Sequence, residues 1–470
     1  MVSWTRRVLP ILGVLTLFAA ACGGGDEEPA TAETTPAAEP SADEPTEDGV
    51  DAIEPEPQEP APDAEPAVED PPAAAPADEP PVVVKTLAIG FAYPDVSAFA
   101  ILNSKFSIGD PEEQAAAVVN GWRRDGLLPI NGHDIELAYR NYPILNSHDK
   151  RGVCASFAQD DEVFAVVSGR DFTVGAECLA TRFSIPVIDH NAAPPTLYER
   201  GAPWFFTVRA NEAEVTTAYV QWGEQQDLFD GGTIGVFWDT RSEEAFEALR
   251  SALEAAGHQV AVDIPSDGEG IGSPQDQISV ERFIAEGVDI AILLVGTSSV
   301  TNFMAFAERQ GYRPMNSVME WSGHIGDVAS ASLPQEQFDG VTGMAISRVG
   351  EIARGDGLSP QAVSCLDNYE RFSGKVIDRS SPENAEFVQI LYTCDLMSLL
   401  YAGLAGAGDD VTPESFVVAL EALQDFPLSA WGNLSYGPGD HAGVQQFRTV
   451  QWQTACGCWT AVTAMSDFAE

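Results

Sequence analysis

The residues of this chain that could do chemistry are hydroxyls, carboxylates and aromatic rings, gathered in a few short runs. Hydroxyl groups can hold an anionic group of a small molecule, and carboxylates can hold a cationic one. Aromatic rings can enclose an apolar part of the same molecule. The pattern therefore indicates a binding site, with candidate ligand contacts at Tyr93, Ser168, Asp171, Phe172, Thr173, His190, Asn191, Trp238, Asp239, Glu320 and Trp321.

Each candidate also has a plainer structural interpretation. Ser168 and Thr173 could cap the helix that follows them. Trp238 and Trp321 could pack between domains. The set as a whole, and no single member, carries the prediction of a site.

Catalytic and cofactor motifs are missing from the sequence. It contains no Gly-rich phosphate loop that opens a helix after a strand, no GxSxG and no HExxH. The six histidines are scattered and never paired at metal-ligand spacing. A catalytic triad assembled from distant parts stays open, but we expect no enzyme, no catalytic residue, no cofactor and no bound metal.

The elements that must position the candidate residues alternate between short apolar runs and stretches of helical period. Strands are predicted at 86–92, 134–140, 163–168, 185–189 and 204–208, and again at 233–238, 260–264, 289–295 and 317–320. Helices are predicted between them, among them 111–127, 148–159, 174–183, 212–225, 243–256, 278–286 and 298–310. This alternation predicts two α/β units in tandem, joined near residue 208, each with a parallel sheet. Open parallel sheets bind ligands beyond the carboxyl ends of their strands, which is where the candidate residues stand.

The C-terminal part has a different pattern. One long helix is predicted at 383–407 and another at 413–423, with Thr412 as its cap. Strands are predicted at 431–436, 447–452 and 459–462.

Cys22 indicates the compartment. It follows Arg6 and Arg7, a short apolar stretch from Val8 to Ala21, and three alanines. This pattern is typical of a secretory signal, and the position of the cysteine resembles the lipobox of bacterial lipoproteins, in which it becomes the lipid-bearing first residue of the mature protein. An ordinary secretory signal, or a short uncleaved anchor, is the alternative.

Residues 23–84 contain no Lys or Arg and are crowded with Asp, Glu, Pro and Ala. Such a composition cannot bury enough apolar surface to fold, so residues 23–85 are interpreted as a disordered acidic tether. Binding of a cation or a basic partner by this run is the alternative. The chain has 24 basic and 72 acidic residues, a formal charge of −48, which argues against nucleic acid or an anionic membrane surface as partners.

Six cysteines remain beyond Cys22, an even number that indicates disulfides in an exported chain. Cys154 and Cys178 fall on successive helical stretches around one strand and are predicted to pair; the other four are Cys365, Cys394, Cys456 and Cys458. Whether Cys456 and Cys458 close on each other is left open. No CxxC pair or Cys/His cluster at zinc spacing is present to favour a metal instead.

Taken together, the chain resembles the type I periplasmic-binding-protein family, and within it the branched-chain amino-acid type of ABC-transporter solute-binding lipoprotein. The resemblance covers residues 86 to about 465. The residues that carry it are Ile130–Gly132, Asp161–Val167, Cys178–Ala180 with Ile185–Ile188, Tyr392–Asp395 with Leu399–Gly406, Gly437–His441 and Cys456–Cys458, the last two being most like actinobacterial members.

The resemblance implies an α/β fold of two Rossmann-like parallel-sheet lobes with a cleft between them. It implies a first lobe at 86–208, a second at 209–335, a return to the first lobe at 336–442, and C-terminal strands at 443–470 that lie partly on the second lobe. The lobes would close on a small solute, with Ser168–Thr173 and His190–Asn191 at a carboxylate and Glu320 at an ammonium. Tyr93 and Trp238 would cover the ligand.

The expected function is that of a lipid-anchored solute-binding protein on the outer face of the cell membrane. It would capture an amino acid or a related small polar solute for an ABC permease, act as a monomer, and contact the membrane only through its lipid. A ligand-binding sensor for a membrane signalling partner is the alternative, and a cell-envelope enzyme is a third. The loops at 91–97 and 189–195 depart from the family's usual patterns, so the sequence does not name the solute.

Overall fold

The structure, a computed structural model, describes residues 84–97, 106–144, 147–267, 273–321, 324–379 and 384–468. The chain divides into Met1–Asp78 and Glu79–Glu470, and the described residues all belong to the second unit. The predictions for the signal, for Cys22 and for nearly all of the tether lie outside the described residues.

The first sheet is a layer of parallel strands in the order β2-β1-β3-β4-β5. Its strands are β1 (Lys85–Asp95), β2 (His133–Pro143), β3 (Ala165–Ser168), β4 (Val187–Asp189) and β5 (Phe205–Thr207). β3 is buried at every position, as expected for a strand covered by helices on both faces.

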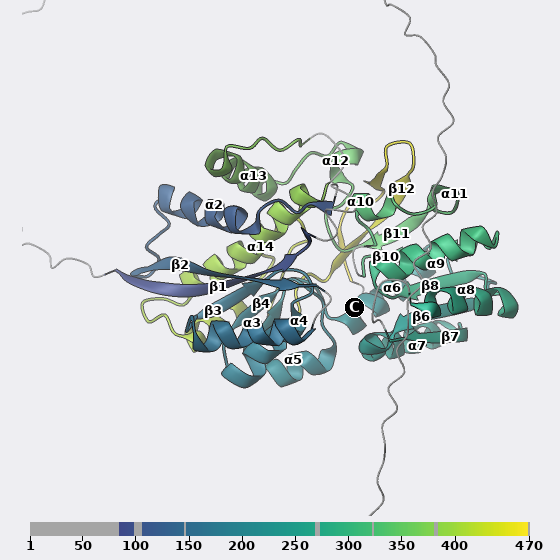
Figure 1. Cartoon of the computed structure of the whole chain (residues 1–470), viewed down its shortest axis with the longest axis horizontal. Coiled ribbons are helices and arrows are strands. Elements are labelled where there is room, and N and C mark those ends of the chain that lie inside the picture. The colour runs from purple at the N-terminus through teal and green to yellow at the C-terminus, as the bar shows by residue number, and fades with distance from the viewer. Residues whose placement is uncertain are drawn as a thin grey trace, which may run out of the picture. The chain divides into compact units, whose positions relative to one another are not determined.

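Helices cover both faces of this sheet (Figure 1). On one face lie α2 (Pro111–Arg124), α13 (Pro360–Ser373) and α14 (Ala385–Gly406), with α15 (Pro413–Glu421) packed on α14. On the other lie α3 (Ser147–Gln159), α4 (Thr173–Cys178) with the π-helical turn Leu179–Phe183, and α5 (Pro195–Gly201). We call this sheet and its helices the first lobe.

The second sheet is also parallel, in the order β7-β6-β8-β9. Its strands are β6 (Ile234–Asp239), β7 (Val260–Ser266), β8 (Ile290–Leu294) and β9 (Met315–Asn316). The elements around it are α6 (Glu212–Gln225), the short 3₁₀ turn Thr240–Ser242, α7 (Glu243–Ala256), α8 (Pro274–Glu286) and α9 (Thr297–Arg309). The two parallel sheets confirm the predicted α/β class.

A mixed C-terminal sheet adjoins the second one. β10 (Val318–Met319) pairs in parallel with β11 (Thr342–Ala345), and β11, β12 (Gln446–Gln453) and β13 (Cys458–Ala461) are antiparallel neighbours, with β14 (Ser466–Asp467) at the edge. The short helices α10 (Asp327–Ser330), α11 (Gln335–Phe338) and α12 (Glu351–Arg354) lie around it. Phe237 of the second sheet and Trp452 of β12 share one buried cluster, so we group both sheets as the second lobe.

The local signals in the sequence explain most helix ends. Asn211 and Glu214 cap α6 reciprocally, and Gly257 ends α7 in the left-handed region with a φ of 94°. Thr412 caps α15 as predicted.

Two features of the C-terminal part differ from the prediction. Residues 431–436 form no strand, only isolated bridges from Trp431 to Ser347 and from Leu434 to Phe426. β11 lies between β10 and β12, so residues 342–345 belong to the second lobe and the chain returns to the first lobe later than residue 336. The period of a short apolar run cannot tell a paired strand from a buried connection.

The cysteines pair within their lobes. Cys154 joins Cys178, which confirms the prediction, and links α3 to α4. Cys365 joins Cys394, linking α13 to α14, and Cys456 joins Cys458, the pairing that the sequence left open.

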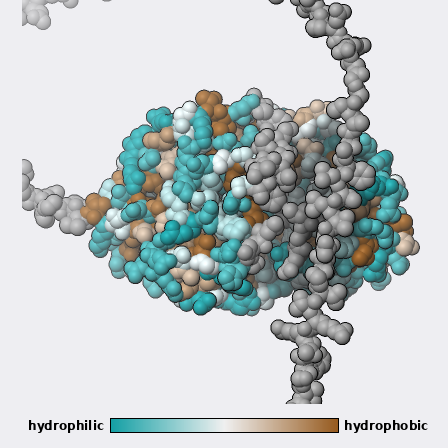
Figure 2. Space-filling view, in the orientation of Figure 1, coloured by the Kyte–Doolittle hydropathy of each residue, from teal (hydrophilic) through white to brown (hydrophobic). Residues whose placement is uncertain are grey.

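α14 is the core helix of the first lobe. Its length and apolar composition alone would suit a membrane span, but 78% of that apolar window is buried inside the protein. The described surface visible in Figure 2 is mostly hydrophilic, with hydrophobic residues scattered over it.

Candidate functional site

Asp189, at the carboxyl end of β4, organises the loop that follows β3. The strand register sets Ser168 beside Asp189. The Ser168 hydroxyl donates to one carboxylate oxygen at 2.8 Å, and the Thr173 hydroxyl donates to the other at 3.0 Å. The Asn191 amide lies 3.3 Å from the same carboxylate. Three residues predicted to hold a solute are therefore used within the protein to hold the loop 168–173.

The environment of Asp189 is dry. Its side chain is fully buried, and burial raises its pKa to about 7, although the hydrogen bonds from Ser168, Thr173 and Asn191 oppose the rise. A group of this kind binds or releases its proton near neutral pH.

The anchored loop presents the guanidinium of Arg170. The Tyr142 hydroxyl donates to the Arg170 carbonyl, and the Gly169 amide donates to Ala92 at 2.9 Å. The guanidinium carbon lies 4.9 Å from the centre of the Tyr392 ring, and the buried Nε has no hydrogen-bond partner.

Arg170 begins a stack of side chains that runs toward the junction of the lobes. Tyr392 is stacked on Trp431, with ring centres 5.2 Å apart, and the Arg209 guanidinium lies 5.5 Å from the Trp431 ring centre. His190 packs edge-on against Tyr392 at 4.3 Å. His190 is buried, and burial holds its pKa well below the usual value, so its ring is neutral at neutral pH.

A cavity of about 120 Å³ lies beside Arg170 and is lined from both lobes. The first lobe contributes Arg170, Tyr392 and apolar side chains of α14, and the second contributes α10 and the segment after β11. Its apolar lining comprises Phe106, Ile108, Ile325, Val328, Ala329, Val349, Leu358, Ala385, Phe387, Val388, Leu391 and Ala430.

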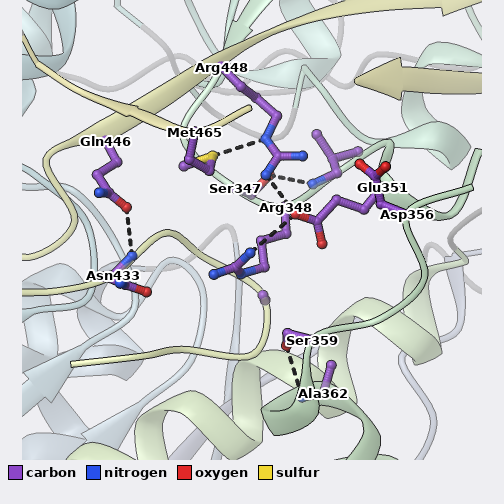
Figure 3. A network of polar contacts seen from close by, with 12 residues as sticks. Ser347, Arg348, Glu351, Asp356, Ser359, Ala362, Asn433, Gln446, Arg448 and Met465 are labelled. Atoms are coloured by element: carbon purple, nitrogen blue, oxygen red, sulfur yellow. Dashed lines mark hydrogen bonds and ion pairs between the residues drawn. The ribbon is translucent and has the colours of Figure 1, made fainter. Parts of the chain in front are cut away.

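Arg348 and Glu351, which line this cavity, belong to a network of polar contacts that also includes Arg448 (Figure 3). One oxygen of Glu351 accepts from Arg348 at 3.2 Å and from the buried Arg448 at 2.6 Å. Arg448 also donates from Nε to the sulfur of Met465 at 2.9 Å (Figure 3). Arg348 lines the cavity, and its buried Nε has no hydrogen-bond partner.

The chain passes between the lobes after β5 at 208–211, after β11 at 346–359 and before β12 at 443–445. We call these segments the crossing strands, and Arg209 and Glu320 hold them together. Arg209 donates to the carbonyls of Glu320 and Trp321, and one Glu320 oxygen accepts from the amides of Ile346 and Ser347, both at 2.9 Å. Both side chains are buried; burial raises the pKa of Glu320 and lowers that of Arg209. Glu320 therefore holds the segment after β11 in place.

Gly443 allows two of the crossing strands to lie in contact. Arg209 forms a parallel β-bridge with Val444, and a Cβ on Gly443 would lie 2.0 Å from the carbonyl oxygen of Val208. Only glycine permits this approach of two backbones.

The remaining predicted residues have partners of their own. Tyr93 donates to Glu112 at 2.5 Å, Phe172 packs on Tyr142 at 4.8 Å, and Trp238 stacks on Phe246 at 4.4 Å. Asp239 forms an ion pair with Arg241, the exposed Asp171 donates its amide to Asn191, and Trp321 is buried.

None of the eleven predicted contacts is among the described residues that line the cavity. Their role in solute binding stays a prediction. Sequence reasoning missed Arg170, Arg348 and Tyr392. Arg170 stood inside a loop that had been singled out, and a lone arginine there, in so acidic a chain, was the available signal.

No cluster of three or more His, Cys, Asp or Glu side chains that could hold a metal occurs within the described ranges. The Ser168, Thr173 and Asn191 groups on Asp189 are donors, not ligands for a cation.

Two α/β lobes, joined by crossing strands and sharing one cavity, define the class of bilobal solute-binding proteins. The model of the periplasmic binding protein family matches residues 86–457, so the chain belongs to that family. None of the curated proteins matches this sequence.

Solved structures of the same fold are numerous. One is a branched-chain amino acid ABC transporter protein from Thermus thermophilus with bound valine, at 14% identity over 82% of this chain and 97% of that chain, with a TM-score of 0.63. Another is a solute-binding protein of an ABC transporter from Rhodopseudomonas palustris BisB5 in complex with 3,4-dihydroxybenzoic acid (15%, 82% and 98%, 0.60). A third is a fatty acid ABC transporter substrate-binding protein from Thermomonospora curvata (14%, 82% and 92%, 0.62). At these identities the likeness establishes the type I periplasmic-binding-protein fold.

Proposed function

We propose that this protein is a lipid-anchored receptor on the outer face of the cell membrane that captures a small organic solute and delivers it to an ABC permease. In this role it binds its solute without chemically changing it. It acts as a monomer and touches the membrane only through the lipid on Cys22.

The observation that carries the proposal is the cavity lined from both lobes at their junction. A solute held there contacts both lobes at once, so its binding energy favours the arrangement in which they are closed together. The crossing strands with Arg209, Glu320 and Gly443 connect the two lobes and are where a hinge motion would take place.

The structural neighbours support a small organic solute, although they differ in what they bind. One of those proteins holds bound valine, another is in complex with 3,4-dihydroxybenzoic acid, and the third is a fatty acid ABC transporter substrate-binding protein. An organic acid of some kind is common to all three, so organic acids form the main part of the starting library, with amides and sugars added for breadth.

A thermal-shift screen of the mature protein against amino acids, aromatic acids, short fatty acids, amides and sugars tests the receptor function. A ligand at 100 times its dissociation constant stabilises the native state by about 2.7 kcal/mol. We expect at least one compound to raise the melting temperature and to be recovered unchanged. A melting temperature that no compound moves, or conversion of the compound, would contradict the proposal.

The anchor needs its own test. In the native host, the wild-type protein should fractionate with membranes and carry a lipid on Cys22, whereas Cys22→Ala should not be lipidated. Mass spectrometry of the mature N-terminus checks this, and an unmodified wild-type Cys22 would exclude a lipoprotein.

An uptake assay distinguishes transport from sensing. Deleting the gene should abolish high-affinity uptake of the bound compound if the protein serves an importer. Normal uptake together with a lost transcriptional response would favour a sensor.

A further inference from the structure

Within the described ranges Arg170 has no acidic partner, although the protein is very acidic. The chain has 72 Asp and Glu against 24 Lys and Arg, and yet no ion pair or hydrogen bond from the Arg170 guanidinium is present among the described residues. The guanidinium lies over the face of the Tyr392 ring. A guanidinium that is partly withdrawn from water and lines a cavity is a binding group for an anion.

Arg348 lines the same cavity and has donors to spare. It shares Glu351 with Arg448, at 3.2 Å and 2.6 Å, so the charge of Glu351 is divided between two guanidinium groups. Its Nε is buried without a partner.

The acids of the cavity wall are already engaged. One oxygen of Glu351 serves the two arginines, and Asp327 accepts the Trp459 amide at 2.8 Å. Arg170 and Arg348 line the cavity with donors that the described wall carboxylates do not fully occupy, which suits an anionic group of a ligand. The wall carboxylates Asp327 and Glu351 already accept from groups of the protein, so an ammonium would have to share them.

Most of the other wall residues are apolar, and Ser347, Ser359, Asn384 and Ser429 are polar. Phe387, Val388 and Leu391 of α14 line the cavity from the first lobe, and Ile325 and Val328 line it from the second. Such a wall stabilises a hydrocarbon body by removing its surface from water.

We propose that the solute is a monocarboxylate with an apolar aliphatic or aromatic body, and that Arg170 and Arg348 bind its carboxylate. This inference rests on the proposed receptor function and narrows its solute class. It differs from the zwitterionic amino acid that the sequence resemblance implied, because the acid assigned to the ammonium, Glu320, holds two backbone amides and does not line the cavity.

The test uses ligands that share a carbon skeleton and differ in their polar groups and therefore in charge. Calorimetric titration of the mature wild-type protein compares 4-methylpentanoate with leucine and 4-methylpentan-1-ol, and 3-phenylpropanoate with phenylalanine and 3-phenylpropan-1-ol. In at least one series we expect the carboxylate to bind at least about tenfold more tightly than the amino acid and the alcohol, because it offers the two arginines an anion without an ammonium that must also be desolvated.

A matched pair of variants tests the residues. Arg170→Gln should weaken binding of the preferred carboxylate at least about 30-fold, since a partly buried charge then loses its partner. Arg170→Lys should retain part of the affinity, because it keeps the charge but not the forked geometry. Arg282→Gln removes the same charge from an exposed position on α8 and should leave affinity unchanged.

The outcomes separate this inference from the receptor function. If leucine, phenylalanine or a neutral solute from the wider screen binds and the carboxylates do not, the carboxylate assignment is wrong and the receptor stands. Equal carboxylate affinity in Arg170→Gln and Arg282→Gln would likewise overturn the role of Arg170. Failure of every solute class would overturn both proposals. If Arg170→Gln does not fold, Arg170→Lys and the wild-type ligand series decide.

Discussion

Replacing Asp189 with asparagine should make the stability of the protein less dependent on pH. Asp189 is buried, and its pKa is raised from an ordinary value of 3.8 to about 7 by that burial. Below about pH 4 the carboxyl is protonated in both the folded and the unfolded chain. Between about pH 4 and 7 only the folded chain keeps the proton, so the free energy of unfolding falls as pH rises through this window.

The size of the effect follows from the shift. About three pKa units correspond to about 4 kcal/mol, because each unit is worth about 1.4 kcal/mol. Between pH 5 and 8 the titration of Asp189 should remove about 2.5 kcal/mol of stability. An asparagine at this position can still bond with the Ser168 and Thr173 hydroxyls but cannot ionise.

Urea unfolding at pH 5, 6, 7 and 8 measures the difference. The wild-type protein and the exposed-site control Asp230→Asn should lose stability in parallel, and Asp189→Asn should lose about 2.5 kcal/mol less across the range. The buried Asp395, whose pKa burial also raises to about 7, remains in all three proteins, so it does not affect the comparison. A variant curve parallel to the wild-type curve would refute the argument that Asp189 is protonated in the folded protein near neutral pH.

Two further changes test the junction and the disulfide framework. Glu320→Ala should lower the free energy of unfolding by about 3 kcal/mol or more in urea titrations, because two buried amides lose their acceptor and Arg209 loses a nearby negative charge; a loss below about 1 kcal/mol would contradict this role. Replacing both Cys154 and Cys178 by alanine should cost about 3.5 kcal/mol, since the bridge closes a loop with a sequence separation of 24; unchanged stability under the same denaturant would show that the bridge does not restrain the unfolded chain.

The stack Arg170–Tyr392–Trp431–Arg209 connects the cavity to the crossing strands. Arg170 lies at the solute end and Arg209 holds the carbonyls of Glu320 and Trp321 at the other. A carboxylate that draws Arg170 away from the Tyr392 ring would therefore change the packing next to the hinge. Under the proposed receptor function, this path would link solute binding to lobe closure.

Much of the fold could be predicted from the sequence because its signals are local. The helix at 212–225 begins directly after its N-cap Asn211, and the helix at 243–256 ends directly before Gly257. Buried runs such as 163–168 identified the parallel strands, and helices that flank one strand identified the pairing of Cys154 with Cys178. The sequence did not predict β11, and it wrongly predicted a strand at 431–436. The pairing of such short segments depends on partners far away in the chain.

For the candidate site, too, the sequence determined some features and the tertiary structure decided the others. The sequence by itself determined the residue types that follow each strand, since alternation of strands and helices fixes which loops gather at one edge of a sheet. It could not determine which way their side chains turn. Only the tertiary structure decided that Ser168, Thr173 and Asn191 satisfy the buried carboxylate of Asp189, because leaving that group unpaired would be costly. Of the residues in the loop 168–173, Arg170 lines the cavity. Arg348, 178 positions further along the chain, lines it too.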